Sequence, residues 1–337
     1  MTSRIILCPG QGAQFVGMGR AWFDQSPEAK AVFERADRHL GDRLGAPLSK
    51  LCFEGPADRL NRTDVSQPAI YATSIACSHA LLAAWGAGKS APEAGIIATG
   101  GLSLGEYTAL HLAGSFSFED GLELVVLRAR AMQDAADAIQ LPDKSPGSGM
   151  VALIGADEAQ ATDLCTRATG RGPERSAPDV LVCANFNCPG QIVISGSIAA
   201  CTRAVEIAAS MGLRAQPLPV AGAFHSPLMA PAAERLAAAL QKTPITAPRC
   251  PVMSNVTGQA HSPIPGRTIE DSIRTRLVEQ LTSPVRWEQD CRSLLAISSG
   301  GVAGAGTQWH ELAPGRGLMG MMRRIEKATK VETHDEP

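Results

Sequence analysis

A strand, a glycine-rich turn and a helix follow one another in the stretch IIATGGLSLGEYTAL, residues 96–110. This order constrains the fold more than any other feature of the chain. The apolar residues before the turn are typical of a buried strand, and the residues after it have the spacing of a helix. The same alternation fills the first 140 residues, as in RIILC followed by PEAKAVFERADRHLG. Strands that alternate with helices indicate an α/β fold built on a parallel sheet.

The alternation is interrupted at QLPDKSPGSG, residues 140–149, where proline, glycine and serine predict a boundary. The next segment has the pattern of a strand, a helix, a two-stranded hairpin and a second helix. This is the order of a split βαβ, ferredoxin-like layer. We therefore predict a large α/β-hydrolase-like catalytic domain from residues 1–143 and 214–337, with an inserted ferredoxin-like α+β subdomain at 144–213.

Three further segments carry structural expectations. The stretch SQPAIYATSIACSHALLAAWGAG predicts a buried core helix with Pro68 at its first position, where a missing N–H is tolerated. The polar residues 170–179 are expected to form an exposed loop. The last residues, 326–337, are expected to form a frayed helix and a charged tail without chemistry.

Composition argues against several classes of protein. The chain has 31 basic and 33 acidic residues, so it lacks the basic excess of a nucleic-acid binder. No run reaches about 18 apolar residues, and the first apolar run is too short for a signal peptide, so we expect neither a membrane span nor export. The nine cysteines form no C-x-x-C pair. We interpret them as reduced thiols of a cytoplasmic protein, and we predict no metal site and no cofactor.

The turn at residues 101–105 has the pattern G-x-S-x-G, with Ser103 at its centre. In a nucleophile elbow, a strand precedes the serine and a helix follows it, so that the hydroxyl is lifted above the edge of the sheet. The N–H groups at the start of that helix can stabilise an oxyanion. The alternative is a glycine-rich βα turn in which Ser103 only caps the helix.

A serine hydroxyl needs a base, and His225 is the favoured one of seven histidines. It lies in PLPVAGAFHSPLM, where a strand ends in a loop of small residues before a new helix. A helix-capping histidine is the alternative. The loop CPGQGAQFVGMG, residues 8–19, follows the first strand and offers a further backbone N–H for an oxyanion hole. It matches neither G-x-G-x-x-G nor a P-loop, which argues against nucleotide binding.

Six blocks in one order carry a resemblance to a known family. They are PGQGAQ, GLSLGEYTAL, RARAMQ, NFNCPGQIVISG, GAFHSPLM and SPVRW. Together they resemble the malonyl-CoA:acyl carrier protein transacylase family over nearly the whole chain, from residue 5 to about residue 325. The resemblance implies a ping-pong transfer of a malonyl group from malonyl-CoA to the phosphopantetheine thiol of acyl carrier protein, through an ester of Ser103 activated by His225.

The resemblance also assigns roles around the serine. The backbone N–H groups of Gln11 and Leu104 match the family's oxyanion hole. Arg128 matches the arginine that binds the malonyl carboxylate, although an exposed helix cation is the ordinary explanation for a single arginine. Met132, one turn further along, resembles a wall of the acyl pocket, with core packing as the alternative. Phe224 resembles the bulky residue of malonyl-selective domains, where it would crowd an α-methyl branch.

The chain departs from the family pattern at several positions. Leu102 stands where the family has a histidine directly before the nucleophile. In SPVRW, Arg286 stands where relatives also have glutamine, and a backbone carbonyl in this region is expected to orient His225. The block TQWHELAPGRGL, residues 307–318, matches the family only loosely, and Trp309 and His310 have no assigned role.

Two other functions therefore stay open. A serine esterase or thioesterase-type hydrolase shares the elbow and the order of serine before histidine. A non-catalytic relative that only binds the carrier protein is suggested by Leu102. The sequence does not distinguish fatty-acid from polyketide biosynthesis.

Overall fold

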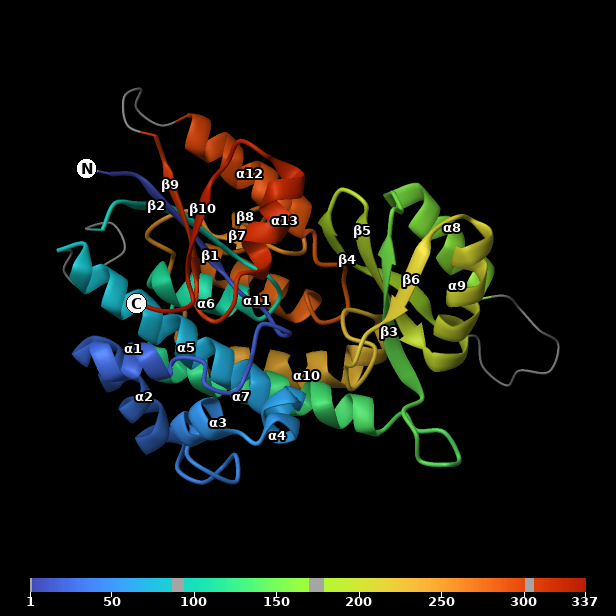
Figure 1. The fold of residues 1–337 in the computed structure, drawn as a ribbon, viewed down its shortest axis with the longest axis horizontal. Helices are drawn as coiled ribbons and strands as arrows, with labels where there is room; N and C mark the ends of the chain where they lie inside the picture. Colours follow the sequence, from blue (N-terminus) through green and yellow to red (C-terminus); the bar gives the residue numbers. More distant parts are fainter. Residues whose placement is uncertain (1, 87–93, 170–178, 301–305) are drawn as a thin grey trace.

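The computed structural model of the chain describes residues 2–86, 94–169, 179–300 and 306–337 (Figure 1). Its first sheet is parallel and has the strand order β10-β9-β1-β2. The parallel sheet predicted from the alternating pattern is thus confirmed. The strands are β1 Arg4–Cys8, β2 Ile96–Gly101, β9 Gln308–Leu312 and β10 Val331–His334.

Helices cover both faces of this sheet, so Ile5 to Cys8 of the inner strand β1 are apolar on both sides rather than alternating. Ile5 and Leu7 of β1 pack towards α12 and α13, whereas Ile6 and Cys8 pack towards the core formed with α5, α6 and α7 (Figure 1). The helices of this unit are α1 Arg20–Gln25, α2 Pro27–Leu40, α3 Leu48–Glu54, α4 Ala57–Asn61, α5 Thr63–Ala84, α6 Gly105–Leu112, α7 Phe118–Asp137, η1 Pro227–Met229, α10 Ala230–Leu240, α11 Ile269–Glu279, α12 Trp287–Ser299 and α13 Gly317–Ile325. A short hairpin, β7 Met253–Ser254 with β8 Gln259–Ala260, completes it.

A second sheet lies to one side of the first and has the order β4-β5-β3-β6 (Figure 1). Its neighbouring strands are antiparallel, and β4 and β5 form the expected hairpin. Helices α8 and α9 cover one face and enclose a separate small core. The elements are β3 Ser148–Ile154, α8 Glu158–Ala168, β4 Leu181–Cys188, β5 Gln191–Ser197, α9 Ile198–Ser210 and β6 Arg214–Pro217. The sheet therefore runs to Pro217, beyond the predicted segment 144–213.

Two local expectations are wrong. Helix α5 begins at Thr63, so Pro68 lies inside it rather than at its first position. The start of α5 is held by Gln133, whose side-chain oxygen accepts a hydrogen bond from Thr63 N at 3.2 Å. The end of the chain is also not a tail, because residues 331–334 form strand β10 beside β9. The alternation of β-branched and polar residues in VETH fits a strand, but a run of four residues between charged neighbours is too short to be recognised in the sequence.

The remaining expectations concern loops and thiols. The loop expected at 170–179 lies outside the described residues except for its last one. All nine cysteines are free, as predicted, and eight of them are buried. In the described part of the chain, no helix combines the length and the apolar character needed to cross a membrane.

Candidate active site

The turn that carries Ser103 is held by close backbone packing. A Cβ on Gly101 would lie 1.9 Å from Gly105 C, and one on Gly105 would lie 2.1 Å from Cys8 O. Only glycine allows the turn to approach itself and the end of β1 so closely. Ser103 has φ of 53°, a left-handed conformation that costs energy for a residue with a side chain. The strained bend places the hydroxyl at the carboxyl end of the sheet, as an elbow requires.

His225 lies beside this hydroxyl. Its Nε2 is 2.8 Å from Ser103 Oγ, and its Nδ1 is 2.7 Å from the backbone oxygen of Gln280. Because a carbonyl can only accept, Nδ1 carries the proton and Nε2 is left to accept from the serine. Burial, followed by the charge of Arg128, lowers the pKa of His225 to about 4. The imidazole is therefore neutral near pH 7, as a base must be.

Arg128 comes from the middle of α7 and is fully buried. One guanidinium nitrogen, Nη2, donates to Ser103 Oγ and to the side-chain oxygen of Gln280, both at 2.9 Å. Nη1 donates to the side-chain oxygen of Gln67 at 2.5 Å. Its pKa is lowered by burial. All three acceptors are uncharged, and no carboxylate among the described residues forms a direct ion pair with Arg128. The charge of Glu106 acts on the guanidinium only through Gln280 and at longer range, so the buried cation faces the serine without a contacting carboxylate.

Two backbone N–H groups near the serine are free to donate. Neither Gln11 N nor Leu104 N donates a hydrogen bond to any described residue, whereas the neighbouring Gly12 N donates to Gln14 and Gly105 N to Leu102 O. Leu104 precedes the first residue of α6, so its N–H lies at the positive end of that helix. These are the two groups that the sequence assigned to an oxyanion hole.

A cavity of about 620 Å³ opens above the serine. It lies between the two sheets, because its wall combines Ser103, His225 and Gln11 with residues of β3, β4 and β5. Met132 and Phe224 both line it and are almost fully buried. The structure therefore brings the predicted site residues to one place, with Leu104 next to Ser103 in the chain at the start of α6.

The sequence missed the polar residues behind the serine. Gln280 donates from Nε2 to Ser103 O at 3.0 Å and to Glu106 at 2.7 Å. Asn255 accepts from Ser103 N at 2.7 Å, and Glu106 contacts His261 at 2.7 Å. Asn255 stands just after a segment that pairs with β2, so its place at a strand end was the one available signal.

The carbonyl that orients His225 was expected in the region of SPVRW, residues 283–287. It is that of Gln280, three residues before this block and directly after α11. The SPVRW block has a structural role, because Val285 exchanges backbone hydrogen bonds of 2.8 and 2.9 Å with Ala184 and Phe186 of β4. It ties the second sheet to the first unit.

A serine at a strand-to-helix bend, bonded to a neutral histidine and set beside free N–H groups, defines a class of site. It is the class in which enzymes transfer or hydrolyse acyl groups through a serine ester.

Comparisons with known proteins narrow this class. The acyl transferase domain family matches residues 5–312. The malonyl CoA-acyl carrier protein transacylase of Bacillus subtilis is 37% identical over 341 residues, which cover all of this chain and 95% of the relative. The crystal structure of malonyl-CoA:acyl carrier protein transacylase from Xanthomonas oryzae aligns with a TM-score of 0.84 at 34% identity, over 100% of this chain and 96% of that one. A malonyl-transacylase in complex with a type II PKS acyl-carrier protein aligns with a TM-score of 0.83 at 31% identity, over 100% and 97%.

The chain belongs to the acyl transferase family and, within it, to the malonyl-CoA:acyl carrier protein transacylases. It is an acyltransferase.

Proposed function

We propose that this protein transfers a malonyl group from malonyl-CoA to the phosphopantetheine thiol of acyl carrier protein by a ping-pong mechanism. The observation that carries the proposal is the position of Arg128. A buried guanidinium that contacts no carboxylate of the described residues, with Nη2 2.9 Å from Ser103 Oγ, is suited to an acyl group that ends in a carboxylate. A neutral acyl group would leave that cation uncompensated.

The first half-reaction forms the serine ester. Ser103 Oγ attacks the thioester carbon of malonyl-CoA while its proton passes to Nε2 of His225. The negative charge that develops on the carbonyl oxygen is stabilised by the N–H groups of Gln11 and Leu104. The C–S bond then breaks, and the imidazolium returns its proton to the departing thiolate. The Nδ1–H bond to the carbonyl of Gln280 keeps the ring in the required orientation.

The second half-reaction reverses these steps with a different thiol. The phosphopantetheine thiol of acyl carrier protein gives its proton to His225 and attacks the ester carbon. The tetrahedral intermediate collapses, Ser103 leaves and recovers the proton, and the malonyl group departs on the carrier. Because the base is neutral at the start of each half, both halves use the same proton acceptor.

Three side chains select the acyl group in this proposal. Arg128 binds the malonyl carboxylate through two parallel hydrogen bonds, for which its planar fork is suited. Met132 and Phe224 form part of the cavity wall, and the Phe224 ring leaves little room for an α-methyl branch.

We also propose that β3 to β6 with α8 and α9 form an inserted ferredoxin-like subdomain on an α/β-hydrolase-like domain, and that the enzyme is cytoplasmic.

Intact-protein mass spectrometry after incubation with malonyl-CoA tests the function. We expect a malonyl adduct that is absent from Ser103→Ala and present in Ser299→Ala, which removes an exposed hydroxyl on α12. Adding the holo carrier protein should move the adduct to the carrier. An unmodified protein would leave only carrier binding, and rapid release of free malonate would identify a hydrolase.

A further inference from the structure

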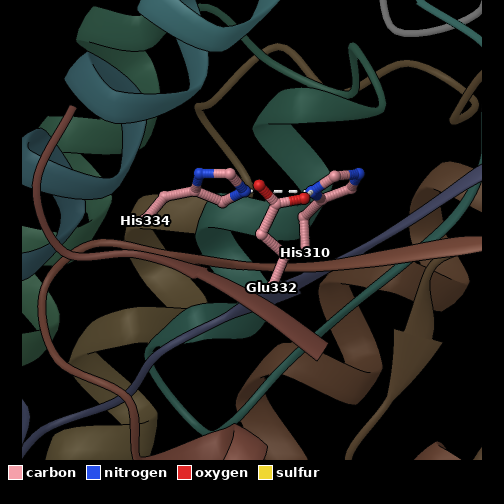
Figure 2. Close-up of side chains that lie close together, drawn as sticks. All are labelled: His310, Glu332 and His334. Carbon is pink, nitrogen blue, oxygen red and sulfur yellow. Dashed lines mark hydrogen bonds and ion pairs between the residues drawn. The ribbon is translucent and has the colours of Figure 1, made fainter. Parts of the chain in front are cut away.

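Three side chains with metal-binding atoms meet on the edge of the first sheet, in strands β9 and β10. The register pairs His310 of β9 with Glu332 of β10. Residues two apart in a strand point to the same face, so His334 joins them there. Figure 2 shows the two imidazole rings turned towards each other with the carboxylate of Glu332 beside the gap between them.

The donor atoms are close enough to share one ion. His310 Nδ1 lies 2.9 Å from His334 Nε2 and 3.4 Å from a carboxylate oxygen of Glu332. One ligand atom from each of the three residues falls within a group whose members are all within 4.8 Å of one another. Donor atoms bound to a tetrahedral Zn²⁺ at about 2.0–2.2 Å are separated by roughly 3.3–3.6 Å, so the present spacing needs only a small expansion.

The surroundings also suit a bound cation. His310 and His334 are almost completely buried, whereas the Glu332 side chain is 66% exposed, which leaves an entry path and room for a water ligand. His310 Nε2 is buried without a hydrogen-bond partner, so Nδ1 is the nitrogen of this ring that faces the other ligand atoms.

We propose that His310, Glu332 and His334 bind one divalent transition-metal ion, with Zn²⁺ the favoured ion. Two imidazoles and one carboxylate are a ligand set typical of Zn²⁺, and they disfavour Mg²⁺ and Ca²⁺, which prefer oxygen ligands. Both inner nitrogens must present lone pairs, so the rings carry their protons on Nε2 of His310 and Nδ1 of His334. The ion would cross-link the C-terminal edge strand β10 to β9. This site uses none of the residues of the proposed acyl transfer.

The test is metal titration of the full-length protein after treatment with a chelator. We expect one equivalent of Zn²⁺ by calorimetry, a rise in Tm with added Zn²⁺, and no comparable effect of Mg²⁺. Co²⁺ should give the visible absorption of a four-coordinate ion without an intense thiolate charge-transfer band, which separates this site from the free cysteines. A thiolate band, or equal responses to Zn²⁺ and Mg²⁺, would overturn the assignment.

Matched variants locate the ion. Glu332→Gln changes an exposed side chain and is expected to weaken Zn²⁺ binding at least about tenfold, as is His334→Gln. His39→Gln is the control, because it disrupts an exposed histidine–glutamate pair on α2 and α7 with an Nε2–Oε1 distance of 2.8 Å. Circular dichroism of the metal-free variants checks the fold, and Glu332→Gln keeps the test decisive if His334→Gln unfolds. Unchanged Zn²⁺ affinity in a folded Glu332→Gln variant, or an equal loss in His39→Gln, would remove the site.

Discussion

Replacing Arg128 by alanine tests how the proposed enzyme distinguishes malonyl-CoA from acetyl-CoA. Two charge-assisted hydrogen bonds to the malonyl carboxylate contribute about 2 kcal/mol each. Arg128 gives up a bond to an uncharged acceptor to form them, which costs about 1 kcal/mol. The net of about 3 kcal/mol corresponds to on the order of 100-fold in kcat/KM. Acetyl-CoA has no carboxylate, so the preference for malonyl-CoA should fall by about that factor.

The assay compares kcat/KM for the two thioesters on the same preparation. Arg128→Ala also leaves the buried side-chain oxygens of Gln67 and Gln280 without a donor, which destabilises the fold. The ratio of the two values is independent of the folded fraction, so it reports selectivity alone. Arg130→Ala, which removes an exposed arginine two residues along the same helix, should leave the ratio unchanged. An unaltered ratio in Arg128→Ala would refute the carboxylate-binding role.

Three further predictions follow from the site and the turn. Only neutral His225 accepts a proton, and burial lowers its pKa to about 4. The value of kcat/KM should therefore stay level from pH 7 down to about 5 and fall towards pH 4. A midpoint near 6.5 in the pH profile would contradict this assignment. Gly105→Ala places a Cβ 2.1 Å from Cys8 O and should lower the free energy of unfolding, measured by denaturant titration, by about 3 kcal/mol or more. Gly320 is exposed in α13, and a Cβ added there would meet no atom within 4 Å. Gly320→Ala should therefore be neutral or stabilising. Gln280→Leu keeps the carbonyl that orients His225 but removes the side-chain hydrogen bonds to Ser103 O, Glu106 and Arg128. We therefore expect kcat/KM to fall about tenfold or more while Ser103 can still be acylated. A wild-type value of kcat/KM would show that the Gln280 side chain does not position the serine.

The sequence predicts those features of the molecule that depend on residues close together in the chain. The bend at Ser103 follows from a strand, three nearby glycines and a helix within 15 residues, and the parallel sheet follows from repeated alternation. His225 was singled out because it follows a strand-like run that was expected to belong to the parallel sheet. That strand is β6, which ends at Pro217 and pairs antiparallel in the second sheet, so this premise is wrong although the residue lies beside Ser103. The structure places it beside Ser103, while the roles of both residues stay predictions.

The rest depends on contacts between distant segments. Gln280 lies 177 positions from Ser103, to whose backbone oxygen it donates, and nothing near Gln280 distinguishes it from an ordinary glutamine at the end of a helix. Likewise, His310 and His334 are 24 positions apart, and only the pairing of β9 with β10 brings them together. The short strand β10 was itself missed, so its register could not be used to find the cluster.

Leu102, which stands where the family has a histidine, is held in the turn by its backbone. Its backbone N donates to Cys8 O at 3.1 Å, and its backbone oxygen accepts from Gly105 N at 2.9 Å. A Cβ on Gly10 would lie 2.4 Å from that same oxygen, so the first loop is packed directly onto this peptide. The elbow therefore holds Leu102 through main-chain groups that any side chain would provide. The leucine side chain instead lines the cavity, so exchanging it for histidine should alter the acyl pocket more than the Ser103–His225 contact.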